Sequence, residues 1–143
     1  MEMTRDLERA RNELDTGRYT CVLCKGEKTY FSNEHGVKPL LTWIHEKTIE
    51  QGCCAADQIV GKAAAFLYIK LGISELYAKV ISAQAIPILE EYGILFAYDQ
   101  VVAFIMNRRG EDMCPMEKTV VGIEDPESAV RALTEKVKEM SRK

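Results

Sequence analysis

One segment, Asp57–Leu71, constrains the fold of this chain more than any other. Its apolar residues recur at helical spacing and leave few polar positions, and three consecutive alanines follow Lys62. A helix that is apolar on most sides has to be covered on most sides. Gly61 and the alanines permit a close approach to a sheet, because nothing larger than a methyl group intervenes. The pattern therefore predicts a central, buried helix that packs on a β-sheet.

The residues before this segment predict a helix, a hairpin and a second helix. Residues 4–14 carry an apolar stripe at helical spacing. The runs 19–24 and 29–32 are rich in β-branched and aromatic residues around a short connection, which is typical of a hairpin. A helical pattern then continues from Leu40 to Ile49, and Gly52 closes it.

Strands and helices alternate in the second half of the chain. In order, the predicted elements are strand 76–81, helix 84–92, strand 94–98, a turn at Asp99-Gln100, strand 101–105, a short helix over 114–121 and a final helix that Asp125 caps. A hairpin followed by strand–helix–strand units predicts an α/β fold with three α/β/α layers and a mixed sheet of about five strands. Residues 1–143 contain no repeat or linker and are expected to form a single domain.

Composition and charge exclude several classes of protein. With 19 basic and 22 acidic side chains the net charge is −3, which gives no basic surface for nucleic acid. No apolar run approaches the roughly 20 residues of a membrane span. The charged segment Met1–Asp6 lacks the apolar core of a signal peptide, and five cysteines are an odd number. We therefore expect a cytoplasmic protein with reduced thiols and no nucleic-acid or membrane partner.

Three motifs resemble those of the cytidine-deaminase-like superfamily, and more closely those of an uncharacterised family of small prokaryotic proteins placed in it. The motifs are Gly61-Lys62-Ala63-Ala64-Ala65, Tyr77-Ala78-Lys79-Val80-Ile81-Ser82, and Asn107-Arg108-Arg109-Gly110 followed by Met113-Cys114-Pro115-Met116-Glu117-Lys118. The resemblance spans roughly residues 7–133, and the last motif is its most specific part. It implies a deaminase-like fold over the whole chain.

The resemblance also implies that this chain has lost the zinc site. Zinc deaminases begin the central helix with His-Ala-Glu, in which the His holds the metal and the Glu moves protons to a zinc-bound water. Lys62-Ala63-Ala64 takes that place here, and no cysteine stands near 82–85, where the two zinc cysteines would lie. A lysine ammonium is not a zinc ligand at neutral pH. We therefore expect neither a metal nor another cofactor.

Cys114 is the most reactive candidate. Pro115 favours the first helical position, which makes Cys114 the N-cap and Glu117 the third residue of a helix. A sulfur there faces unpaired amides, and nearby Arg108 and Arg109 add positive charge, so the pattern predicts a thiolate nucleophile or a redox-sensitive thiol. The alternative is a capping box, in which Glu117 reaches back to the amide of residue 114 and the cysteine is only a small cap.

Lys62 and Asp57 are charged residues of the apolar central segment. Lys62 is predicted to hold a phosphate or carboxylate, or to act as a base if it is buried. In the alternative, its stem packs on the helix while the ammonium reaches water or pairs with Asp57. Asp57 is interpreted as the helix cap, and also as a ligand-binding residue.

The loop Asn107-Arg108-Arg109-Gly110 follows a strand and precedes a helix. Its two guanidinium groups and free amides suit a phosphate or carboxylate, although a solvated basic turn explains the same residues. Ser82 ends a strand, where open α/β sheets carry their ligands, and it also suits a helix cap.

The other cysteines and the two histidines are interpreted as structural. Cys21 and Cys24 lie three apart on a strand, so their side chains point to opposite faces and cannot chelate one metal together. Cys53-Cys54 lies in a stretch of small residues and is expected to be buried. His35 and His45 stand alone in the sequence, and we expect no metal site.

These observations lead to one leading hypothesis and two alternatives. In the first, a zinc-free protein of the deaminase fold binds a small anionic, nucleotide-like molecule. The expected ligand-binding residues are Asp57, Lys62, Ser82, Asn107 and Arg108. Asp57, Lys62 and Ser82 are expected on one side of the pocket, and Arg108, Cys114 and Glu117 on the other.

In the second hypothesis, the protein is an enzyme in which Cys114 is the nucleophile and Lys62 or Arg108 stabilises developing negative charge; Glu117 completes the expected catalytic set. In the third, it is a non-catalytic structural or interaction module that forms a homodimer through its apolar strands and helices.

Overall fold

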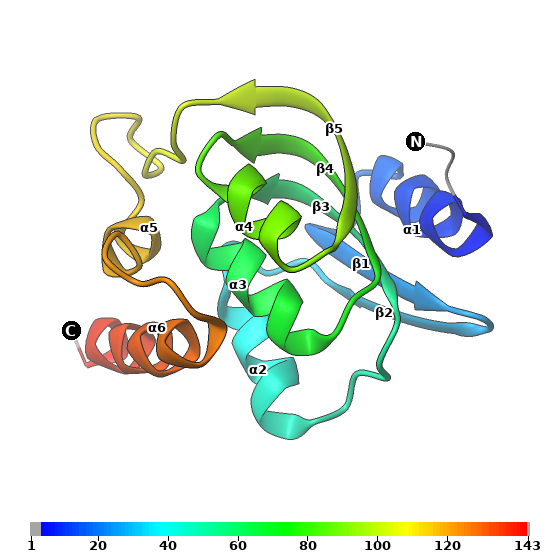
Figure 1. Cartoon of the computed structure of the whole chain (residues 1–143), viewed down its shortest axis with the longest axis horizontal. Helices are drawn as coiled ribbons and strands as arrows, with labels where there is room; N and C mark the ends of the chain where they lie inside the picture. The colour runs from blue at the N-terminus through cyan, green and yellow to red at the C-terminus, as the bar shows by residue number, and fades with distance from the viewer. Residues whose placement is uncertain (1–3, 143) are drawn as a thin grey trace.

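A computed structural model describes residues 4–142 (Figure 1). In chain order its elements are α1 (Arg5–Asp15), β1 (Cys21–Lys25), β2 (Lys28–Ser32), α2 (Lys38–Glu46), β3 (Cys54–Val60), α3 (Lys62–Leu71), β4 (Glu75–Ser82), α4 (Ala85–Glu91), β5 (Leu95–Val102), α5 (Pro115–Thr119) and α6 (Pro126–Ser141). Among these helices none is both long and apolar enough to cross a membrane.

The five strands form one mixed sheet in the order β2-β1-β3-β4-β5. The hairpin partners β1 and β2 are antiparallel, β1 also pairs antiparallel with β3, and β3, β4 and β5 run parallel. Figure 1 shows α1 on one side of this sheet and the other helices on the opposite side. The expected three-layer α/β fold with an N-terminal hairpin is therefore confirmed.

The central helix is α3, and it is as buried as its composition predicts. Its residues 63–68 all lie in the core, where α3 contacts α2, α4 and α6 as well as the sheet. On the other face of the sheet, Leu7, Ala10 and Leu14 of α1 pack on Val22 and Ala56. Both faces of the inner strands are thus covered.

One expected boundary of α3 is wrong. The helix begins at Lys62 rather than at Asp57, and residues 54–60 form the central strand β3. The first residues of β3 are small and buried on both faces, between α1 and α3, so no alternation of apolar and polar residues marks them as a strand. Asp57 is therefore a strand residue and not a helix cap.

Two other boundaries also differ from the prediction. Residues 95–102 form the single strand β5, with Asp99 inside it, instead of two strands around a turn. The carboxylate of Asp99 accepts a hydrogen bond from the Tyr77 hydroxyl at 2.5 Å, which satisfies this polar residue within the sheet. The second helix, α2, ends at Glu46, because Lys47 adopts a left-handed conformation (φ 57°).

Candidate functional site

A cavity of about 730 Å³ opens at the carboxyl end of β3. Its wall is made by residues 57–59 and Gly61, by the start of β1 and the segment that leads into α2, and by the loop after β5. The start of α5 and the end of α6 complete the wall. The carboxyl ends of parallel strands are the usual location of ligand sites in open α/β sheets, because the following loops surround them.

Five of the residues predicted from the sequence meet in this cavity, and two do not. The lining residues among them are Asp57, Asn107, Arg108, Cys114 and Glu117. The side chain of Ser82 is buried, and its hydroxyl accepts a hydrogen bond from the Ala85 amide at 3.2 Å, so that it caps α4. Lys62 also lies outside the cavity wall.

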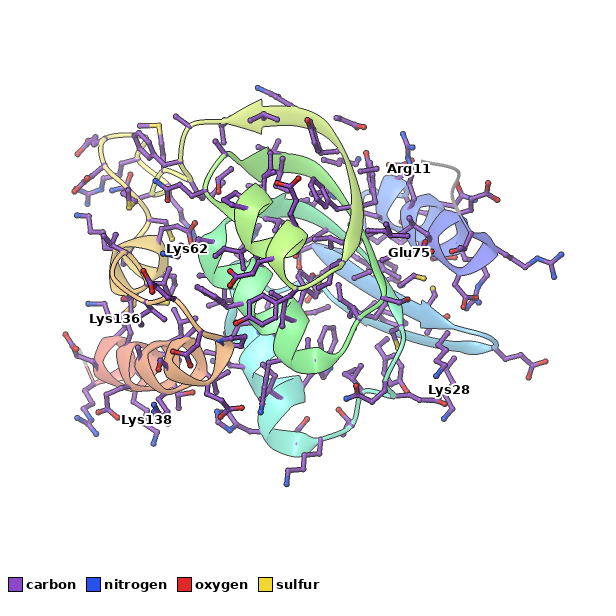
Figure 2. The ribbon with its side chains drawn as sticks, viewed as in Figure 1. Arg11, Lys28, Lys62, Glu75, Lys136 and Lys138 are labelled. Atoms are coloured by element: carbon purple, nitrogen blue, oxygen red, sulfur yellow. The ribbon has the colours of Figure 1, made fainter. Side chains whose placement is uncertain are left out.

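Lys62 reaches away from the cavity. Figure 2 shows it between α3 and α5, and its ammonium donates to the carbonyl of Val121 at 3.3 Å. The same ammonium lies 5.8 Å from the centre of the Phe66 ring. The ammonium thus bonds to a backbone carbonyl, while Asp57 is bonded elsewhere and is not its ion-pair partner.

Glu117 caps a helix other than its own. Its two carboxylate oxygens accept hydrogen bonds from the backbone amides of Lys62 at 2.7 Å and Ala63 at 2.8 Å, at the start of α3. The side chain is 4% exposed, and burial raises its pKa, while the two amides act in the opposite direction. The expected capping box is wrong, because the amide of Cys114 donates instead to the carbonyl of Ile105 at 2.9 Å.

Gly61 is required by this cap. A Cβ atom added at Gly61 would lie 2.0 Å from Oε1 of Glu117 and 2.8 Å from Cγ1 of Ile105. The backbone of Gly61 is extended (φ −100°), so the restriction is the space that the carboxylate needs. The glycine before Lys62 thus lets a carboxylate from α5 reach the first amides of α3.

Asp57 lies in the cavity wall beside two neutral donors. Its Oδ2 accepts a hydrogen bond from the buried hydroxyl of Tyr68 at 2.5 Å, and its Oδ1 accepts from the backbone amide of Ile59 at 3.2 Å. Cys21, on β1, is its partner in the sheet register. Burial raises the pKa of Asp57 from 3.8 to about 7, and the hydrogen bonds only partly oppose this effect.

The loop after β5 presents two arginines at the cavity. Its shape is fixed by backbone bonds from Asn107 to Asp112 at 2.7 Å and from Gly110 to Asn107 at 3.0 Å. Arg108 and Arg109 at its tip are exposed and line the cavity. The loop can therefore place two guanidinium groups on an anion.

Several lining residues were not expected from the sequence. His35 and Lys38 precede or begin α2, and Val137 and Met140 belong to α6. No motif marks these residues, since they meet the loop after β5 only through the packing of the whole chain. Tyr68, which holds Asp57, was also missed because it looks like an ordinary core residue of α3.

The cysteines are placed as the strand geometry predicts. Cys21 belongs to the core on the α3 side of the sheet and Cys24 to the core on the α1 side. Cys53 and Cys54 are buried, and all five thiols are free. Over residues 4–142, no three His, Cys, Asp or Glu side chains are grouped so that they could hold a metal ion.

Comparison with known proteins gives a family and a fold. A family model described as a domain of unknown function (DUF1893) matches residues 9–137. The crystal structure of a DUF1893 family protein (TM1506) from Thermotoga maritima is similar, with a TM-score of 0.84 and 30% sequence identity. The alignment covers 94% of this chain and 92% of that one. No curated protein matches the chain.

Proposed function

The chain belongs to the DUF1893 family, a family of unknown function, and we propose that it is a zinc-free protein of the deaminase fold that binds a small anionic, nucleotide-like molecule. One observation carries this proposal. Arg108 and Arg109 line the same cavity as the carboxylate of Asp57, at the carboxyl end of the central strand. The cavity therefore offers cationic groups for an anion and an acceptor for the rest of the ligand.

The size and the walls of the cavity support a small organic ligand. A volume of about 730 Å³ falls within the roughly 300–1,000 Å³ that is usual for such sites. Ile59, Val137 and Met140 provide apolar wall on which a flat ring can pack. Guanidinium groups bind phosphate and carboxylate through paired N–H donors, so Arg108 and Arg109 are the expected partners of the anionic group.

The start of α3 supports the placement in the cytidine-deaminase-like superfamily. Lys62-Ala63-Ala64 begins the helix that follows the central strand, where the zinc deaminases carry His-Ala-Glu. The ammonium of Lys62 cannot bind zinc, and the methyl group of Ala64 cannot transfer a proton to a zinc-bound water. Here the carboxylate of Glu117 occupies the first amides of the helix. We infer a scaffold that keeps the crevice of a deaminase and uses it for binding.

Calorimetric titration tests the proposed function. We expect wild-type protein to bind nucleoside 5′-monophosphates at least tenfold more tightly than the corresponding nucleosides at low salt. The double variant Arg108→Ala/Arg109→Ala should lose that difference, because no guanidinium group then meets the phosphate. Arg5→Ala/Arg131→Ala removes two arginines that do not line the cavity and should bind as the wild type does. Equal binding of monophosphate and nucleoside by the wild type would overturn the proposal.

Nucleophilic chemistry at Cys114 is the second candidate function. The position of Cys114 in the cavity wall favours this function. Cys114 lines the cavity and is half-buried, whereas the other four cysteines are buried. Alkylation under native conditions should therefore occur mainly at Cys114, and the variant Cys114→Ser is the control for reaction at the other thiols. A thiolate nucleophile requires a labelling rate that titrates well below the ordinary thiol pKa near 8.5. A rate that titrates at about 8.5 excludes it.

A further inference from the structure

Asp57 is a carboxylate in a cavity wall without a cationic partner. Its contacts come from the Tyr68 hydroxyl and the Ile59 amide, which are both neutral. In the range 4–142 it takes part in no salt bridge. Carboxylates in such places are usually paired, because an isolated buried charge is costly. A compensating donor can come from the molecule that fills the cavity.

Each oxygen of Asp57 still has a free acceptor position. An ionised carboxylate offers about four lone-pair sites, and one donor per oxygen occupies only two of them here. Asp57 is half-buried as a whole residue, and it lines the cavity. The hydroxyl of Tyr68 fixes its orientation from the core, since Tyr68 itself is fully buried. The two carboxylate oxygens are thus held in place at the cavity wall.

Two parallel acceptors match two adjacent N–H donors. Such pairs form two hydrogen bonds at once, as in the bidentate contact between a guanidinium group and a carboxylate. Among the common nucleobases, guanine presents adjacent donors, at N1 and the 2-amino group. Adenine and cytosine present a donor beside an acceptor, and uracil has a single N–H between two carbonyl groups. A carboxylate that accepts from a ligand through both oxygens can therefore discriminate between these rings.

We propose that Asp57 is a specificity-determining residue that selects a guanine-type ring, whose N1–H and 2-amino groups donate to its two oxygens. The inference rests on the proposed function, because the phosphate of the same ligand is assigned to Arg108 and Arg109. It adds the class of ring that the cavity accepts. Binding of such a ligand would lower the raised pKa of Asp57, since two donated hydrogen bonds stabilise the ionised form.

Four probes separate the ring from the phosphate. They are GMP, IMP, which lacks the 2-amino group, guanosine, which lacks the phosphate, and ribose 5-phosphate, which lacks the ring. We expect calorimetry to show that the wild type binds GMP at least tenfold more tightly than IMP, because IMP has no donor for the second Asp57 oxygen. Ribose 5-phosphate should bind more weakly than either nucleotide.

Asp57→Asn tests the residue itself. Its side chain has nearly the same shape but replaces one acceptor with a donor, so the preference for GMP over IMP should fall below threefold. Asp99→Asn is the matched control. Asp99 also accepts a tyrosine hydroxyl at 2.5 Å, from Tyr77, but it does not line the cavity. Asp99→Asn should keep the preference of the wild type.

The outcomes distinguish this inference from the proposed function. Equal binding of GMP and IMP by the wild type, with both tighter than guanosine, overturns the role of Asp57 and leaves the anion site standing. A preference for GMP over IMP together with equal binding of GMP and guanosine supports Asp57 and overturns the anion site. Absence of binding by all four probes overturns both. The wild-type comparison decides the matter even if Asp57→Asn fails to fold.

Discussion

At the scale of single residues, the structure explains why Asp57 and Gly61 stand next to the start of α3. Asp57 holds a carboxylate in the cavity wall through Tyr68 and Ile59. Gly61 leaves the space that the carboxylate of Glu117 occupies. Gly61 therefore serves a contact with a distant part of the chain, whereas the contacts of Asp57 come from the same strand and from the following helix.

Asp57 should make the stability of the protein depend on pH. Its pKa is about 7 in the folded state and 3.8 when unperturbed, so the unfolded chain ionises first as the pH rises. The stability that Asp57 contributes is complete below about pH 4 and is lost as the pH rises through 7. Asp57→Asn removes this loss. Between pH 4 and 8, we expect urea unfolding to show that the free energy of unfolding of the variant, relative to that of the wild type, rises by on the order of 4 kcal/mol. Parallel pH profiles would contradict this.

Gly61→Ala should destabilise the protein by roughly 2–4 kcal/mol, because the new methyl group displaces the buried carboxylate of Glu117. Urea unfolding of the single variants and of the double variant with Glu117→Ala measures the coupling. In the double variant the alanine should add less than about 1 kcal/mol to the cost of Glu117→Ala, since only the side chain of Ile105 still has to move. Additive costs would show that the clash is not with Glu117.

Residue roles that act locally could be predicted from the sequence, and roles that act at a distance could not. Thr4 and Asp125 cap the helices that follow them, as their positions indicate, through bonds to amides three residues away. Glu117 has the same kind of sequence signature, but it bonds to amides 54 and 55 residues earlier in the chain. A local motif cannot distinguish between these two cases.

At the scale of elements, α5 and the loop before it form part of the cavity wall, and α5 is bonded to the start of α3. Glu117 is the connection, because its carboxylate accepts from the first two amides of α3. The sequence predicted α5 and α3 correctly as helices but not β3 between residues 54 and 60. Strands covered on both faces lack the alternation by which a strand is recognised, so β3 merged with the apolar pattern of α3.

Loss of the cap should loosen the start of α3. Glu117→Ala leaves two amides without their acceptor and should cost roughly 2–3 kcal/mol. Hydrogen exchange should show faster exchange at Lys62 and Ala63 than in the wild type, while the amides at the start of α6, which Asp125 caps, should be unaffected. Glu117→Gln keeps one carbonyl acceptor and should give an intermediate rate. Unchanged exchange at Lys62 and Ala63 would contradict the assigned cap.

At the scale of the whole molecule, the sequence predicted the layers but not the full wall of the cavity. The hairpin, the parallel strands and the buried central helix follow from local patterns, and the DUF1893 relative shares the fold. The wall combines β3, the approach to α2, the loop after β5 and the end of α6. These segments lie far apart in the chain, so only the motif-bearing part of the wall was predicted.

The prediction about self-association concerns the outer strand β5. Within residues 4–142 it pairs only with β4. It exposes Leu95, Tyr98 and Val101, and it contains no lysine or proline of the kind that protects sheet edges. Under the hypothesis of an interaction module, sedimentation should show a dimer that Val101→Lys weakens at least tenfold. Val121→Lys, at an exposed valine outside β5, is the control. A monomer at all concentrations would reject this hypothesis.

The most direct test of the binding site is a titration of ¹⁵N-labelled protein with nucleoside 5′-monophosphates, followed by amide chemical shifts. We predict saturable shifts at residues 57–61 and 105–109, which belong to two segments of the cavity wall that lie far apart in the sequence, and no comparable shift in β2 or α1. Saturable shifts confined to other surfaces, or no saturable shift with any of the nucleotides, would contradict the assignment of the cavity as the ligand site.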